Sequence, residues 1–107
     1  MIIAIVIENQ LKMTVGDCLS DASVFLIYDS DKKIKQIIPL PICEPQLMKA
    51  ICFSKYLKDH LVEIVFARDL GPKAKSYLND LLIRYSSSID YDSAENVISN
   101  INKNKIR

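Results

Sequence analysis

Glycine, histidine and tryptophan are scarce in this sequence. The 107 residues include two glycines, one histidine and no tryptophan, and aromatic residues make up only 7% of the chain. Loops that bind phosphate groups need several closely spaced glycines, so two isolated glycines exclude a P-loop and a dinucleotide-binding fingerprint. A single histidine likewise excludes a histidine-rich metal site. The composition therefore argues against most familiar classes of small enzyme.

The chain also lacks an excess of charge of one sign and a long hydrophobic run. Fourteen basic and thirteen acidic side chains leave a net charge of +1, which provides no general attraction to nucleic acid or to an anionic membrane. The apolar run at residues 2–7 is far shorter than the roughly 20 residues of a membrane span, and no basic segment precedes it as in a secretory signal. We therefore expect a cytoplasmic protein with neither nucleic acid nor a membrane as its partner.

The three cysteines are an odd number and cannot form a closed disulfide framework. Disulfides are rare in a reducing cytoplasm, so we expect free thiols at Cys18, Cys43 and Cys52. Half of the residues are hydrophobic, and a chain of this length suits one compact core. We therefore expect residues 1–107 to form a single domain.

Five segments have the composition of β-strands. Residues 2–7 are continuous and mostly β-branched, which is typical of a strand buried on both faces of a sheet. Residues 9–22 contain few apolar positions and many turn-forming residues, so we expect a loop there. The expected strands are residues 2–7, 24–28, 34–38, 62–66 and 82–85.

Three segments have helical patterns. Apolar residues recur at helical spacing between Leu47 and Leu61, after a proline at position 45 that suits a first helical turn. Gly71-Pro72 opens a second helix, and Asp92 is expected to cap a third helix in the manner of a capping box. Two helices alternate with the last two strands, so right-handed crossovers should make these strands parallel to the first strand. The pattern predicts a three-layer α/β fold in which a five-stranded mixed sheet also contains an antiparallel meander.

The sequence resembles a known family over residues 2–102. The segments that carry the resemblance are an Ile-Ala-Ile first strand, Phe25-Leu-Ile-Tyr-Asp29, residues 57–67, Gly71-Pro72-Lys-Ala and Arg84-Tyr85 before the last helix. The chain is similar to the dinitrogenase iron–molybdenum cofactor biosynthesis family, which includes NifX-like and NafY-like proteins and the C-terminal domain of NifB. The resemblance implies a ribonuclease-H-like fold with strand order 3-2-1-4-5.

The resemblance also implies where a cofactor would bind, although this chain departs from the family pattern. The family's His-Phe-Gly triplet falls on residues 18–20, so Cys18 stands where the metal-associated histidine would be. A Gly/His-rich loop of the family corresponds to residues 39–45, which contain Cys43. Of the family's Gly-Gly-x-Gly-Pro turn, only Gly71-Pro72 remains, and a Gly-rich turn before the last helix has become three serines at residues 86–88.

Cys18 and Cys43 are the candidate metal ligands. Thiolate is a softer ligand than imidazole, so cysteine in place of histidine keeps an affinity for iron. Backbone N–H groups at the helix start near Gly71 are a candidate site for an anionic cargo, with charge added by Arg68 and Lys73. The alternatives are ordinary loop cysteines and a plain helix start.

Cys52 and His60 have simpler interpretations. Cys52 lies in a stripe with Met48 and Tyr56 at helical spacing, which is typical of packing. His60 falls at the end of the same helix, where a positive charge suits the helix dipole. No nucleophile can be placed beside this histidine, and the strands carry no carboxylate cluster for a two-metal nuclease, so we do not expect an enzyme.

Two functions follow from these observations. The first is a small carrier that transiently binds an iron–sulfur or iron–molybdenum type cluster through Cys18 and Cys43 and works with a cofactor-assembly protein. The second is a protein-interaction domain that keeps the fold but has lost the cofactor, and that pairs with itself as a homodimer or with another protein.

Overall fold

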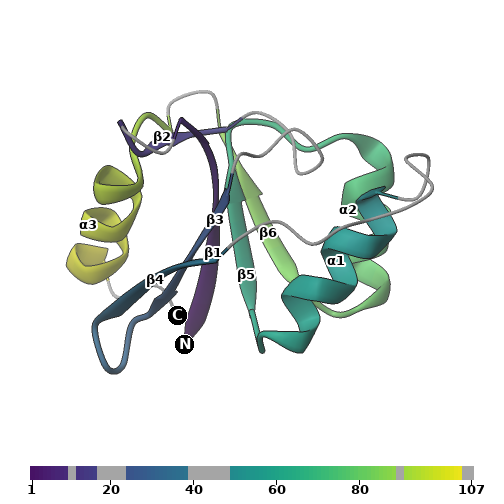
Figure 1. Ribbon diagram of the computed structural model, residues 1–107, viewed down its shortest axis with the longest axis horizontal. Coiled ribbons are helices and arrows are strands. Elements are labelled where there is room, and N and C mark those ends of the chain that lie inside the picture. The colour runs from purple at the N-terminus through teal and green to yellow at the C-terminus, as the bar shows by residue number, and fades with distance from the viewer. Residues whose placement is uncertain (10–11, 17–23, 39–48, 89–90, 105–107) are drawn as a thin grey trace.

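Helices cover both faces of one mixed β-sheet (Figure 1). The computed structural model describes residues 1–9, 12–16, 24–38, 49–88 and 91–104. In chain order the elements are β1 (Ile2–Asn9), β2 (Thr14–Val15), β3 (Val24–Asp29), β4 (Ile34–Ile38), α1 (Lys49–Asp59), β5 (Ile64–Ala67), α2 (Pro72–Asp80), β6 (Arg84–Ser87) and α3 (Ala94–Asn104).

The sheet has the expected mixed topology. Its strand order is β4-β3-β1-β5-β6, which is the predicted order 3-2-1-4-5 for the five longer strands. The pairs β1–β3 and β3–β4 are antiparallel, whereas β1–β5 and β5–β6 are parallel. Within the described residues the sheet contains six strands, so the prediction of five was wrong.

The additional strand is β2, which lies in the segment expected to be a loop. It pairs antiparallel with the end of β1, where Val15 stands opposite Ile7. The backbone N–H of Val15 also donates to the carbonyl of Asp92 at 3.0 Å, just before α3. Two residues are too few to show an alternating pattern, so this strand is held by its neighbours and not by a hydrophobic periodicity of its own.

Strand β1 contributes to two separate cores because successive side chains point to opposite faces of a sheet. Helices α1 and α2 cover one face and α3 covers the other, which gives the predicted three layers (Figure 1). Each fully buried isoleucine or valine in these cores stabilises the fold by about 1.5–3 kcal/mol. The core under α1 and α2 includes Ala4, Val6, Phe25, Phe53, Leu57 and Leu78, and the core under α3 includes Ile3, Ile5, Leu26, Tyr28, Val97 and Ile98.

Helices α1 and α2 end in the same unusual way. Leu61 and Leu82 have backbone φ angles of 62° and 61°, in the left-handed region that favours glycine. The residue after each leucine donates a backbone hydrogen bond to the carbonyl five positions earlier, at 3.2 Å after α1 and 2.9 Å after α2. Both leucines are highly exposed, at 72% and 86%, so neither is fixed by core packing.

These helix ends explain why two strands start later than the sequence suggested. Strands were expected at residues 62–66 and 82–85, whereas β5 begins at Ile64 and β6 at Arg84. The residues in between are used to reverse the chain after each helix. The cap of α3 also differs from expectation, because the side chain of Ser93, and not that of Asp92, accepts a hydrogen bond from the backbone N–H of Asn96 at 3.2 Å.

The left-handed leucines predict a stabilising substitution. Replacing Leu82 by glycine should raise the free energy of unfolding by about 1 kcal/mol, because a non-glycine residue in this conformation costs roughly 1–2 kcal/mol. The measurement is urea denaturation followed by circular dichroism. Leu82→Ala is the matched control, since it removes the exposed side chain and keeps the Cβ atom. A stability gain of the same size in both variants would show that the backbone conformation is not the cause.

Candidate functional site

The carboxyl ends of the parallel strands meet at one edge of the sheet, at the top of Figure 1. The register places Ile5 of β1 beside Phe66 of β5, and Ala67 of β5 beside Ser87 of β6. Ligands of open α/β sheets bind outside the carboxyl ends of the strands, at a point where the strand order changes direction. In this sheet, β1 lies at such a point because the chain adds β3 and β4 on one side of β1 and then β5 and β6 on the other side.

Both candidate cysteine ligands lie outside the described residues, but the chain beside them is described. The segment that contains Cys18 follows Gly16 and precedes Val24, which pairs with Ile7 near the end of β1. The segment that contains Cys43 follows the end of β4, where Ile38 pairs with the start of β3. The described residues that flank Cys18 and those that precede Cys43 are therefore at the carboxyl-end edge.

Gly16 joins the ends of two strands at this edge. Its N–H donates to the carbonyl of Val6 in β1 at 2.7 Å, and its own carbonyl accepts from the N–H of Arg68 after β5 at 2.8 Å. A Cβ atom on Gly16 would lie 3.0 Å from Cγ1 of Val6 and 3.3 Å from the backbone nitrogen of Glu8. A methyl group at this position would force its neighbours to move by a few tenths of an ångström, so the close packing favours glycine. Gly16 falls in the segment that was expected to be a loop, although a β-branched pair followed by one of only two glycines was a signal for this crossing.

The second glycine lies at the start of α2. Gly71 is the N-cap residue and Pro72 the first helical residue, and no side chain caps this end of the helix among the described residues. A Cβ atom on Gly71 would have no described heavy atom within 4 Å, so the described residues do not crowd this side of the cap. The N-terminus of α2 also carries the positive end of the helix dipole.

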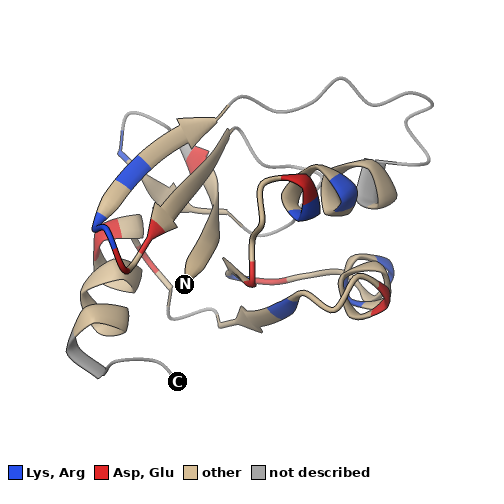
Figure 2. Cartoon of the chain, turned by 90° about the horizontal axis from the view of Figure 1, so that it is seen from below, with Lys and Arg blue, Asp and Glu red and all other residues tan. Residues whose placement is uncertain are grey.

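Charged side chains flank the start of α2. Arg68 is half-buried and Lys73 is exposed, while the exposed carboxylate of Asp69 accepts the N–H of Leu70 at 2.9 Å. Basic side chains thus outnumber acidic ones beside the helix start, in a molecule whose described surface otherwise mixes both signs (Figure 2). This arrangement favours an anion over a cation.

Hydrogen bonds fix the end of β6, whose last two residues are serines that were expected to lie in a turn. The hydroxyl groups of Ser86 and Tyr91 are hydrogen-bonded to each other, and the ring of Tyr91 lies 5.8 Å from that of Phe66 between centroids. The N–H of Ser88 donates to the carbonyl of Ala67 at 3.2 Å. The chain after β6 is therefore tied both to the end of β5 and to the residues before α3.

Cys52 lies in α1, and His60 directly follows the end of this helix. Cys52 is half-buried in α1 against the core, as expected, but it is disulfide-bonded, so the expectation of three free thiols was wrong. Cys52 is the only cysteine within the described residues, and its partner is therefore not described. His60 follows α1, where its Nδ1 atom lies 2.9 Å from the carbonyl oxygen of Tyr56 and its ring lies 4.5 Å from the tyrosine ring.

The described residues do not form a metal centre on their own. Among them, no three His, Cys, Asp or Glu side chains are close enough to hold a metal ion together. Metal ligation by Cys18 and Cys43 therefore stays a prediction, and the described part of the site supplies backbone N–H groups and positive charge.

No helix in the described part of the chain is long and apolar enough to cross a membrane.

A mixed sheet between helical layers defines a three-layer α/β protein. The chain belongs to the dinitrogenase iron–molybdenum cofactor family, because the sequence model of that family matches residues 1–104. This match confirms the resemblance that the sequence motifs indicated. Curated protein sequences show no match to the chain.

Solved structures that share the fold include PH0822, an orange protein and a Thermotoga protein. The crystal structure of PH0822 has a TM-score of 0.82 at 23% identity, and the match covers 100% of this chain and 95% of that chain. The apo form of the orange protein from Desulfovibrio gigas has a TM-score of 0.81 at 15% identity, with 99% of this chain and 90% of that chain covered. A Thermotoga protein assigned as NifB and to the DUF35 family has a TM-score of 0.68 at 16% identity, with 96% and 87% covered. Identities this low establish a shared fold.

The two glycines should respond differently to the same substitution. Gly16→Ala should lower the free energy of unfolding by about 1–3 kcal/mol, because the added methyl group overpacks the backbone crossing. Gly71→Ala should change it by less than about 1 kcal/mol, because a φ of −64° suits alanine whereas alanine is a poorer N-cap residue than glycine. Chemical denaturation of both variants tests this, and equal losses at the two positions would contradict the assigned roles.

Proposed function

We propose that this chain binds an iron–sulfur or iron–molybdenum type cluster and delivers it to a protein that assembles a metallocofactor. In this role it is a cytoplasmic accessory factor and catalyses no reaction itself. The observation that carries the proposal is geometric: chain segments leading to Cys18 and Cys43 start at the same sheet edge as the open helix cap at Gly71. Membership of the dinitrogenase iron–molybdenum cofactor family supports the same cargo.

The chemistry of the edge suits such a cargo. Thiolates are the usual ligands of iron–sulfur clusters, and Cys18 and Cys43 are the proposed ligands in this chain. Clusters with bound thiolates are anionic, so backbone N–H groups at the start of α2 and the side chains of Arg68 and Lys73 would stabilise the bound charge. Few protein ligands are an advantage for a carrier because the cargo has to leave again.

The disulfide of Cys52 limits when the cargo can bind. The chain has three cysteines, so an intrachain disulfide of Cys52 consumes one of the two proposed ligands. A thiol paired in a disulfide cannot ligate iron. The proposed carrier therefore loads its cluster in the reduced state, with both Cys18 and Cys43 available as thiolates.

Anaerobic reconstitution with ferrous iron and sulfide tests the proposal. The reduced wild-type chain should develop charge-transfer absorption in the visible range and retain iron through gel filtration. Cys18→Ala should lose this absorption because one proposed ligand is removed. Cys52→Ala should load without prior reduction, since the disulfide that consumes a ligand can no longer form; wild type without reductant is the matched comparison.

Two outcomes would contradict the carrier. Unchanged absorption in Cys18→Ala would overturn the ligand assignment, and no iron uptake by the reduced wild type would overturn the carrier itself. The second outcome would favour the protein-interaction domain that has kept the fold without the cofactor. The exposed leucines at the ends of α1 and α2 are the feature that favours this second function.

We also propose a finer classification of the fold. The sheet combines a three-stranded antiparallel meander with parallel strands reached by helical crossovers, and strand order supports assignment to the ribonuclease-H-like class. The described elements share a continuous sheet, which supports one domain over residues 1–107. Limited proteolysis that releases no stable fragment would agree with a single domain.

A further inference from the structure

Strand β4 forms one lateral edge of the sheet and is exposed along most of its length. It ends the strand order, and within the described residues no strand pairs with its outer side. Its first four residues are exposed and only its last is buried. Two of the exposed side chains are large and apolar, with Ile34 at 57% and Ile37 at 44% exposure.

Proteins usually protect such an edge. Charged residues, proline, bulges or very short strands prevent an edge from pairing with another chain. β4 has five residues and a single charged side chain, Lys35, and its pairing with β3 runs without a break in register from Ile34 to Ile38. No strand of the described residues therefore uses the outer backbone groups of β4.

We propose that two copies of this chain pair through their β4 strands, antiparallel and centred on Gln36, to form a continuous sheet across a homodimer. This pairing does not depend on the cargo site. A twofold axis perpendicular to the sheet relates the two strands, so residues whose numbers sum to 72 stand opposite each other. Such an interface is self-complementary because each strand contributes the same residues to it.

The sequence of β4 suits this register on both faces of the sheet. On the face that carries α1 and α2, Ile34 stands opposite Ile38 of the second copy, and the two Gln36 side chains meet at the axis. On the face that carries α3, Lys35 stands opposite Ile37 of the second copy. Ile34 and Ile38 form an apolar pair, and no like charges are opposite each other. Moving the centre to Lys35 would bring two ammonium groups together at the axis, which disfavours that alternative.

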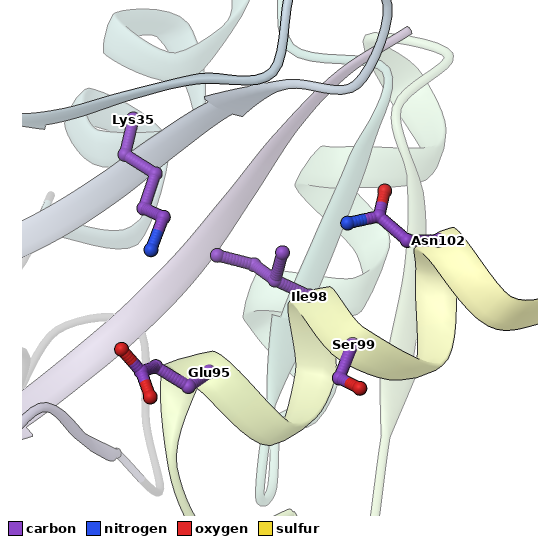
Figure 3. Close-up of a pocket in the computed structure, with 5 residues that line it drawn as sticks. All are labelled: Lys35, Glu95, Ile98, Ser99 and Asn102. Atoms are coloured by element: carbon purple, nitrogen blue, oxygen red, sulfur yellow. The ribbon is translucent and has the colours of Figure 1, made fainter.

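A groove beside β4 gives the second copy a surface to cover. It has a volume of about 540 Å³ between β4 and α3 and is lined by Lys35, Glu95, Ile98, Ser99 and Asn102 (Figure 3). Lys35 extends over it from the strand, and Glu95 lies on the opposite wall (Figure 3). In the proposed dimer, Ile37 of the second copy lies against the methylene groups of Lys35 and closes the lateral side of the groove.

The size of this interface predicts a weak and reversible dimer. A strand of five residues with two exposed isoleucines buries less than the roughly 1,200 Å² at the lower end of stable interfaces. We therefore expect dissociation in the micromolar range, about 10 µM to 1 mM. The monomer must fold without its partner, and it has two closed cores to do so.

A charge exchange at the axis tests both the dimer and its register. Gln36→Glu and Gln36→Lys each place two like charges opposite each other, so each variant alone should dimerise about fivefold more weakly than wild type. An equimolar mixture of the two variants should form a heterodimer at least as tight as the wild-type homodimer. Sedimentation equilibrium with reductant present measures these constants, and ¹⁵N labelling of one variant identifies the heterodimer by native mass spectrometry.

Asn79→Glu and Asn79→Lys are matched controls, because they introduce the same charges at an exposed amide residue of α2, away from β4. They should leave the dimer unchanged, singly and mixed. The proposal is overturned if wild type is monomeric up to about 1 mM. It is also overturned if the Gln36 variants dimerise like wild type, if their mixture restores nothing, or if the Asn79 variants abolish the dimer.

Discussion

The fold depends on the burial of β1 on both faces. Its alternate side chains contribute to the core under α1 and α2 and to the core under α3, so neither layer can be displaced without exposing part of this strand. A strand in that position can have no polar side chain in its middle and must be paired on both edges. The meander supplies one neighbour and the first helical crossover supplies the other. The change from antiparallel to parallel pairing at β1 follows from these two connections, because a helical crossover brings the chain back in its original direction whereas a meander reverses it.

The candidate site lies at the carboxyl end of the same strand. At this edge β3 begins, and β4, β5 and β6 end. Gly16 links β1 to the residue after β5 by backbone hydrogen bonds. The described part of this edge is thus held by backbone hydrogen bonds, which place few demands on side chains. The proposed ligands Cys18 and Cys43 lie outside the described residues.

Hydrophobic patterns, with the right-handedness of helical crossovers, were sufficient to predict the layers and the direction of strand pairing. The order of the longer strands was implied by the family resemblance. Patterns failed where structure is set by tertiary contacts or by backbone conformation. Thr14–Val15 is a strand only because β1 and the residues before α3 bind it, and Leu82 adopts a conformation that its residue type disfavours. The start of a helix at Gly71-Pro72 was visible in the sequence, but the lack of crowding beside Gly71 among the described residues was not. The disulfide of Cys52 contradicted an expectation drawn from cellular location, because composition does not reveal which sulfur atoms are adjacent.

The proposed pairing of β4 strands has a consequence for the proposed cargo. Antiparallel pairing reverses the direction of one sheet relative to the other, so the carboxyl-end edges of the two copies face opposite ends of the dimer. The two candidate sites then cannot share one cluster, and neither is covered by the partner copy. Each copy must therefore hold its cargo with its own ligands, and the dimer would present two independent carriers. A cluster that bridged two copies would need their carboxyl-end edges to face each other, which a continuous sheet through β4 does not allow.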